Sequence, residues 1–369
     1  MKPWVRRLLW GVAIVLGLPL LLGLLWLLLN RIDADPQPWP EALALPANTL
    51  PAEDNPLLAL PLASSAKGTL ALGDCKADAD CFALWRTRLT HLAAVRAANP
   101  ELGLACEAAA AREGLRYEDP MPEPMTIWGP SPRVFGASQC HTWLLSRALD
   151  ALAAGDAAQT QHWLARADRV DRAVLSGGRS LQAHMVGLAN WHQKLAVLHM
   201  AAQQHPQWAA ALAPLAVLDG RQLLASQQAW VRVEANYGRV AVDSMRVDVC
   251  RGQVEASWFA WWSCTVGAPA AQPEYLTQRF ATRWVRVLTI LGNADSLPAA
   301  LPSLNEALLD HAQGWWSQVR HTIPTILDDV AQTAWPGQFE RAARVLADAE
   351  ATHRWLLNPA TPRPAISTR

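Results

Sequence analysis

Residues 137–164 read ASQCHTWLLSRALDALAAGDAAQTQHWL, and this stretch decides the fold class of the chain. Its first half has apolar residues at helical spacing, namely Trp143, Leu144, Ala148 and Leu152. Gly155-Asp156 then supplies a turn, and the sequence from His162 to Leu164 continues a second helix. The stretch therefore predicts two helices joined by a tight turn.

This helix–turn–helix pattern is similar to one unit of a tetratricopeptide repeat. A solenoid of such units would repeat the pattern at a period of about 34 residues. The sequence contains no convincing second copy at that spacing. We therefore expect a generic helical hairpin.

Apolar residues at helical spacing continue on both sides of the hairpin. Helices are expected over about 80–98, 99–114, 180–204, 206–218, 220–236, 273–292 and 338–357. One window differs, because apolar residues partly alternate between Val240 and Cys250, which suggests a strand that turns at Arg251-Gly252. Whether residues 240–264 form strand or helix stays open, and either outcome leaves the class mainly α.

The N-terminus carries a candidate membrane anchor. Leu8 to Leu29 is a run of 22 uncharged residues, which as a helix rises about 33 Å and can cross a hydrocarbon core. Lys2, Arg6 and Arg7 precede the run and acids follow it, so residues 1–7 are expected in the cytoplasm and the rest outside. A cleaved signal peptide is the alternative, but its apolar region would be shorter and its cleavage site closer. A single transmembrane helix over residues 8–29, followed by an exported multi-helix domain of helical hairpins, is the favoured interpretation.

The exported part divides into three regions by composition. Residues 30–61 are expected to be a Pro-rich tether, because seven prolines break any regular element there. Residues 62–357 are expected to form the periplasmic α-helical domain. Residues 358–369 are Pro-rich again, and we expect a disordered tail.

Cysteine usage agrees with export, because all six cysteines follow the apolar run. Neighbouring cysteines suggest three disulfides, between the pairs Cys75–Cys81, Cys106–Cys140 and Cys250–Cys264. The alternative is that some are free, buried thiols. Fifteen full pairings exist, so the sequence does not decide the connectivity.

Composition limits the class of partner. The chain is 51% hydrophobic and 17% charged, with 32 basic and 32 acidic side chains. Four of the bases lie in the first 31 residues, so the remainder is slightly acidic. We therefore expect no nucleic acid partner. The expected partners are the membrane, through the N-terminal helix, and an envelope protein.

The exported region resembles a family of uncharacterised, N-terminally anchored periplasmic helical proteins of Gram-negative bacteria. The resemblance covers about residues 1–200 and rests on short motifs, namely Asp54-Asn55-Pro56-Leu57-Leu58-Ala59-Leu60, the pair Cys75 and Cys81, Arg116-Tyr117-Glu118-Asp119-Pro120, and long helices beginning near His141. It implies a topology and a compartment, and no activity.

The sequence offers no strong catalytic, cofactor or metal motif. His184, His192 and His199 share one side of a helix with several leucines, so they are expected in the core or at an interface, and their spacing does not suit one metal ion. The carboxylates Glu118, Asp119 and Glu123 lie in a Pro-rich loop, where we expect a solvated acidic crossing. Residues 176–180 form a plain turn or a small anion-binding nest, and the plain turn is favoured.

Two features suggest a binding surface. Residues 172–218 contain three fixed positive charges and four histidines but no acid. Tryptophan is dense, with Trp258, Trp261 and Trp262 close together. A possible interaction face therefore comprises His184, His192, His199, Trp258, Trp261 and Trp262.

Two classes of function remain. The favoured one is a membrane-anchored periplasmic protein that binds a protein partner, as an assembly factor, scaffold or inhibitor. The alternative is a hydrolase-like periplasmic enzyme whose site combines scattered groups such as His141, His184 and the carboxylates of residues 118–123. A pocket lined by those groups would favour the enzyme.

Overall fold

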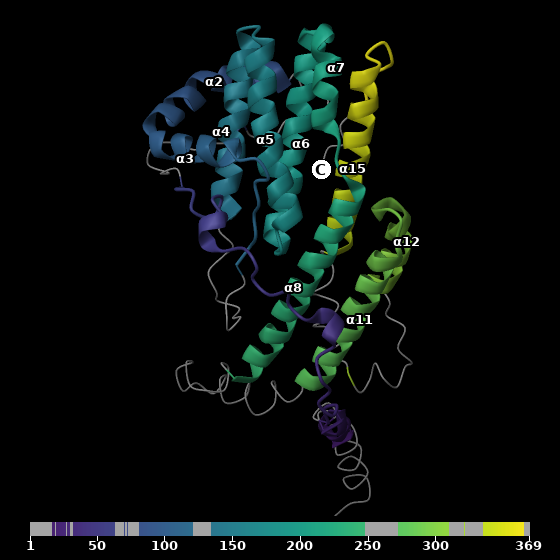
Figure 1. Cartoon of the computed structure of the whole chain (residues 1–369). Helices are drawn as coiled ribbons and strands as arrows, with labels where there is room; N and C mark the ends of the chain where they lie inside the picture. Colours follow the sequence, from purple (N-terminus) through teal and green to yellow (C-terminus); the bar gives the residue numbers. More distant parts are fainter. Residues whose placement is uncertain are drawn as a thin grey trace, which may run out of the picture.

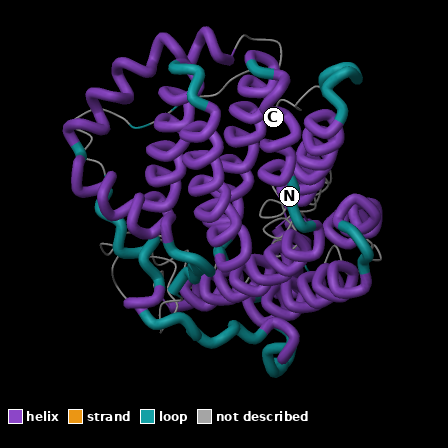
Figure 2. Tube along the Cα trace, turned by 45° about the horizontal axis from the view of Figure 1, so that its top comes forward, coloured by secondary structure: helices purple, strands orange, loops and turns teal. Residues whose placement is uncertain are grey.

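The computed structural model describes residues 17, 18, 20–26, 28, 29, 32–62, 70, 72, 81–120, 134–247, 272–309, 321 and 335–364. These residues form helices and connecting segments without any strand, as Figure 2 shows. The prediction of a mainly α fold is confirmed.

Three antiparallel helices form the centre of the molecule: α4 (Val134–Ala153), α5 (Ala157–Gly177) and α6 (Leu181–Gln204) (Figure 1). The turn between α4 and α5 uses Gly155 at a φ of 72°, where glycine carries no steric penalty. Asp156 then caps α5 by accepting a hydrogen bond from the Gln159 N–H at 3.0 Å. The predicted helix–Gly155-Asp156–helix hairpin is confirmed.

Two shorter helices, α2 (Cys81–Ala98) and α3 (Pro100–Ala111), cover one side of α4. Arg96 of α2 pairs with Asp150 and donates to Ser146 Oγ at 2.7 Å, both on α4. Gly103 of α3 lies directly against the Trp143 ring, so α3 approaches α4 closely. These contacts fix the α2–α3 pair to the central helices.

The other side is formed by α8 (Gly220–Val247), α11 (Pro273–Asn293), α12 (Leu297–Leu309) and α15 (Trp335–Leu357). The short elements η4 (Pro206–Trp208), α7 (Ala209–Leu212) and η5 (Ala213–Ala216) connect α6 to α8. Trp230 of α8 is fully buried, and its ring lies 5.8 Å from Trp335 and 5.1 Å from Phe339, both on α15. A third ring, Trp284 of α11, lies 6.3 Å away. This aromatic cluster joins α8, α11 and α15.

The structure corrects the expectation for residues 236–250. α8 continues without interruption to Val247, so the helix does not end near Asn236 and the suggested strand is wrong over residues 240–247. Val242 is buried, and the Phe280 ring of α11 lies 4.0 Å from where a Cβ atom of Gly238 would stand. Packing between two long helices therefore outweighs a short apolar alternation. Residues 248–264 lie outside the described residues.

Residues 32–62, which we call the N-terminal strap, run along the helices. The strap contains two single turns, η1 (Glu41–Leu43) and η2 (Ala52–Asp54). Leu43 and Leu57 are fully buried, and Asn236 of α8 donates a hydrogen bond to the Leu43 carbonyl at 2.7 Å. The Pro-rich composition prevents long helices here, but it does not keep the strap away from the helical domain.

The N-terminal apolar run is described only in part. Residues 17, 18, 20–26, 28 and 29 are helical, and their leucines are largely exposed. Within the described part of the chain, we find no helix whose length and apolar content would let it cross a membrane.

Candidate functional site

The first buried polar cluster lies at the N-terminus of α6, and we call it the α6 junction: Tyr117, Glu118, Asp119, Arg179 and Ser180. Asp119 is fully buried and accepts hydrogen bonds from the Arg179 N–H, the Ser180 N–H and the Ser180 hydroxyl, at 3.0, 3.0 and 2.8 Å. The Tyr117 hydroxyl donates to its other oxygen. A carboxylate in this position satisfies free N–H groups and complements the helix dipole.

Glu118 links the α6 junction to the strap. Its carboxylate accepts hydrogen bonds from Thr49, at 2.7 Å from the backbone N–H and 2.8 Å from the hydroxyl, and it lies 2.8 Å from the Arg179 guanidinium. Burial alone would raise the pKa of Glu118, but the hydrogen bonds from Thr49 and the charge of Arg179 outweigh it and lower the pKa.

The expected solvated acidic crossing is therefore wrong for Glu118 and Asp119. Both are buried, because the strap and the α6 N-terminus supply enough donors to replace water. The possible anion nest at residues 176–180 has its backbone N–H groups occupied by Asp119. Glu123 lies outside the described residues.

Glu234 of α8 adds a titratable group next to the α6 junction. Its carboxyl oxygen lies 3.4 Å from the Leu181 N–H, which donates to it. Burial raises the pKa of Glu234 to about 7, against the lowering effect of that hydrogen bond. A carboxyl group that titrates near neutrality can take up or release a proton under physiological conditions.

The second cluster is a buried set of ion pairs between α4, α5 and α6. The Lys194 ammonium is fully buried, pairs with Asp168, and lies 3.9 Å from Asp171 and 3.2 Å from the centre of the Trp191 ring. Asp171 in turn lies 2.7 Å from His141 Nδ1. Burial lowers the pKa of Lys194, and the two aspartates oppose this effect.

Sequence reasoning missed this cluster. A lysine within the apolar residues of a long helix was an available signal, because a buried lysine requires an acidic partner. The acid-free stretch of residues 172–218 is neutralised by acids from outside it. Arg172 and Lys194 pair with Asp168, and Arg179 pairs with Glu118.

His184 is fully buried, so the core interpretation is confirmed for this residue. Trp230 Nε1 donates to the side-chain oxygen Oε1 of Gln227 at 2.9 Å, so the side-chain nitrogen Nε2 of Gln227 donates to His184 Nε2 at 2.7 Å. With Nε2 as acceptor, the network assigns the proton to Nδ1, which lies 2.9 Å from Ser226 Oγ. Burial lowers the pKa of His184 to about 3.

His199 is also buried, between α6 and α15. Arg363 donates from Nε to His199 Nδ1 at 3.1 Å, so Nε2 carries the proton and lies 2.8 Å from Thr352 Oγ1. Burial, together with the charge of Arg363, lowers the pKa of His199 to about 4.

The expected interaction face is not formed by His184 and His199, because neither reaches the surface. His192 is partly exposed, and Trp258, Trp261 and Trp262 lie outside the described residues. The structure also does not combine His141, His184 and Asp119 into one site, since each belongs to a separate network. No group of three or more metal-binding side chains occurs in the part of the chain that the structure describes.

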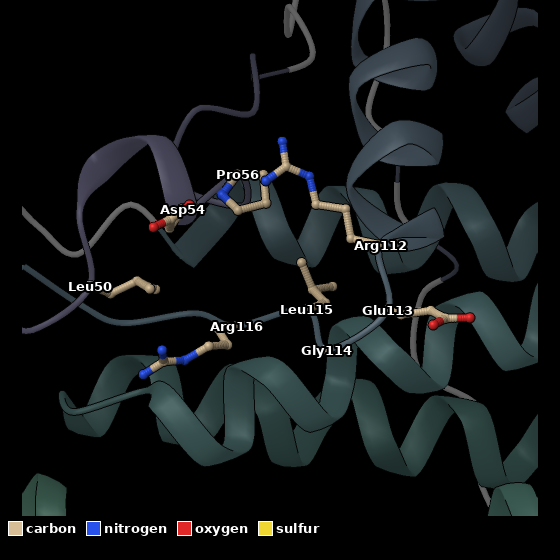
Figure 3. A pocket seen from close by; sticks show the side chains of 8 residues that line it. All are labelled: Leu50, Asp54, Pro56, Arg112, Glu113, Gly114, Leu115 and Arg116. Carbon is tan, nitrogen blue, oxygen red and sulfur yellow. The ribbon is translucent and has the colours of Figure 1, made fainter.

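A surface cavity of about 230 Å³ lies between the strap and the segment that leads into the α6 junction (Figure 3). It is lined by Leu50, Asp54, Pro56, Arg112, Glu113, Gly114, Leu115 and Arg116. Figure 3 shows Arg112 and Arg116 extending on either side of Leu115, with Arg112 close to Pro56. Leu115 and Leu50 are half-buried, whereas the four charged side chains are exposed. The cavity therefore combines an apolar floor with charges of both signs, and we call it the strap cavity.

No family model matches the chain, and no curated protein or solved structure shows detectable similarity to it.

Proposed function

We propose that the chain is a single-pass inner-membrane protein whose helical domain lies in the periplasm and binds another envelope protein, as an assembly factor, a scaffold or an inhibitor. The observation that supports a periplasmic location is the disulfide between Cys106 of α3 and Cys140 of α4, with Cα atoms 5.3 Å apart. Disulfides persist in oxidising compartments and are rare in the cytosol. The basic residues before Leu8 and the acids after Leu29 agree with this orientation.

The strap cavity supports the proposed binding of a protein. Its charged side chains, Asp54, Arg112, Glu113 and Arg116, surround half-buried leucines. A polypeptide offers both apolar side chains and charges of both signs, and arginine is common at the centre of protein interfaces.

The anchor and the compartment are tested by fractionation. A reporter that is active only in the periplasm, fused after Arg369, should be active, and the protein should stay with membranes after an alkaline wash. Thiol labelling in denaturant without reductant should leave Cys106 and Cys140 unmodified, because both are buried in the folded chain and only denaturant makes a free thiol there accessible. Release of a shortened soluble form would reject the anchor, and labelling of both cysteines would reject the oxidised state.

Binding at the strap cavity is tested by photo-crosslinking in intact cells. A photoreactive residue replacing Leu115 should give a discrete adduct of higher mass, and the substitution Arg112→Glu in the same chain should reduce it. The matched control is the same residue at Leu357, which is exposed at the end of α15. Absence of an adduct from position 115, or equal adducts from both positions, would reject the cavity as a binding site.

A second candidate function, a periplasmic hydrolase, is favoured by one observation. Asp119, which accepts hydrogen bonds from Arg179 and Ser180, lies at the same helix end as Glu234, whose pKa is raised to about 7 by burial. A carboxyl group whose pKa lies near neutrality is suited to general acid–base catalysis. Hydrolysis of chromogenic esters or amides that titrates near pH 7 and disappears in Glu234→Gln would support it. Activity that is unchanged in this variant would reject the assignment.

A further inference from the structure

We infer that the helical domain lies directly on the membrane surface, with the N-terminus of α11 in or next to the phospholipid headgroup layer. This inference rests on the proposed membrane anchor and adds how the domain is placed relative to the bilayer. A free Pro-rich tether over residues 30–61 would allow the opposite arrangement, in which the domain moves freely away from the membrane.

Asp33 fixes the first residues of the strap to α11. Its two carboxylate oxygens accept hydrogen bonds from the backbone N–H groups of Glu274 and Tyr275, at 3.0 and 2.9 Å. These N–H groups belong to the first turn of α11, where no carbonyl within the helix can accept them and a negative charge is favourable. Gln278, one turn further, donates to the Asp35 carbonyl at 2.5 Å. The strap is therefore bound to the helical domain from its second described residue.

The connection between this point and the apolar helix is short. Leu29 and Asp33 are four positions apart in the sequence, and a fully extended chain spans at most about 14 Å over that distance. The Ile32 N–H donates to the Leu29 carbonyl at 3.3 Å, so these two residues lie closer together than they would in an extended chain. The headgroup layer is about 5–8 Å thick on each side of the hydrocarbon core. If Leu8–Leu29 spans the core, the first turn of α11 lies within or just above the headgroups.

The overall arrangement agrees with this distance. Figure 1 shows the apolar helix beyond the lower ends of α8 and α11, on the side of the molecule opposite the α4–α5 turn. Side chains near this end are of the kind found at membrane surfaces: the Arg239 guanidinium lies 5.1 Å from the centre of the Trp39 ring, and Tyr275 stacks on His321 at 3.7 Å. Tryptophan and tyrosine are enriched at headgroup depth.

The test measures the distance of two positions from the lipid headgroups. The full chain is reconstituted into vesicles of phosphatidylethanolamine and phosphatidylglycerol that contain a lipid with a nitroxide quencher on its headgroup. A fluorescent amino acid replaces Thr277 in the first turn of α11 or, as the matched control, Ala158 in the first turn of α5. We expect quenching at position 277 to be several-fold stronger than at position 158.

Equal quenching at the two positions, in protein that stays with the vesicles after an alkaline wash, would overturn the inference and leave the anchor intact. Loss of the protein from the vesicles in the wash would overturn the anchor as well. A second variant carries Asp33→Ala and twenty Gly/Ser residues inserted between Asn30 and Arg31. Such a linker adds about 25 Å of root-mean-square reach, so quenching at position 277 should fall several-fold. Unchanged quenching would overturn the role of the short connection.

Discussion

Acidification from pH 7 to pH 5 should destabilise the helical domain through its two buried histidines. The folded pKa values of His184 and His199 are about 3 and 4, below the value of about 6.5 in an unfolded chain. The unfolded chain therefore takes up protons below pH 6.5 that the folded chain cannot bind. The stability associated with each neutral histidine is complete above pH 6.5 and is lost as the pH falls towards 4.

The size of this loss of stability follows from the two pKa values, and the titration of Glu234 partly offsets the loss. One pH unit corresponds to about 1.4 kcal/mol for each proton difference, so each histidine removes about 2 kcal/mol between pH 7 and pH 5. Glu234 has a raised pKa of about 7, so the folded chain holds its proton more tightly. It contributes about 2 kcal/mol in the stabilising direction over the same range. We expect a net loss of about 2 kcal/mol in the wild type.

Two variants separate these contributions. In His184→Gln one histidine is gone, so the free energy of unfolding should be nearly independent of pH between 7 and 5. In Glu234→Gln the opposing group is gone, and the loss should increase to about 4 kcal/mol. The measurement is urea unfolding of the full chain in detergent micelles, followed by tryptophan fluorescence at several pH values. Parallel pH profiles for the wild type and both variants would refute the burial of these groups as the cause.

Three further predictions concern stability at neutral pH, measured by the same urea titration. Replacing both Cys106 and Cys140 with alanine should lower the free energy of unfolding by about 4 kcal/mol, because the disulfide closes a loop of 34 residues; a wild-type value would show that the pair is reduced. Lys194→Met should cost about 3–5 kcal/mol, since it removes a positive charge that the buried Asp168 and Asp171 share, and a neutral effect would contradict the buried ion pairs. Gly177→Ala should lower the free energy of unfolding by about 1–3 kcal/mol or more, because the new Cβ would stand 1.5 Å from the Tyr117 carbonyl oxygen. Gly238→Ala, in an open position of α8, should instead stabilise by about 0.5–1 kcal/mol, and the same sign for both glycine variants would contradict the close packing at Gly177.

The local elements of this fold could be predicted from the sequence, because they depend on neighbouring residues. The α4–α5 hairpin follows from apolar spacing on either side of Gly155-Asp156, and both helices occur as expected. The predicted end of α8 near Asn236 is wrong. The contact with α11 that extends the helix comes from residues about 40 positions later in the chain.

The buried polar clusters could not be predicted, because their partners are distant in the sequence. Asp119 accepts hydrogen bonds from Arg179 and Ser180, which lie 60 and 61 positions later, and Glu118 receives hydrogen bonds from a strap residue 69 positions earlier. A Pro-rich loop with two acids is usually solvated, and only the folded chain shows that donors surround both. Polar residues in loops acquire their role from tertiary contacts that no local pattern records.

The acid-free stretch from Arg172 to Leu218 shows that a local charge pattern can still indicate a tertiary contact. A basic, acid-free segment suggests a surface for an acidic partner, but Lys194 lies in the middle of an apolar helix, where a charge is tolerated only with a counter-charge beside it. The imbalance within the segment therefore predicts acids elsewhere in the same chain. These acids are Asp168 on α5 and Glu118 of the α6 junction. Because the positive charges of residues 172–218 are paired only when both of these acids are in place, the charge pattern couples the docking of the segment that carries Glu118 to the packing of the central helices.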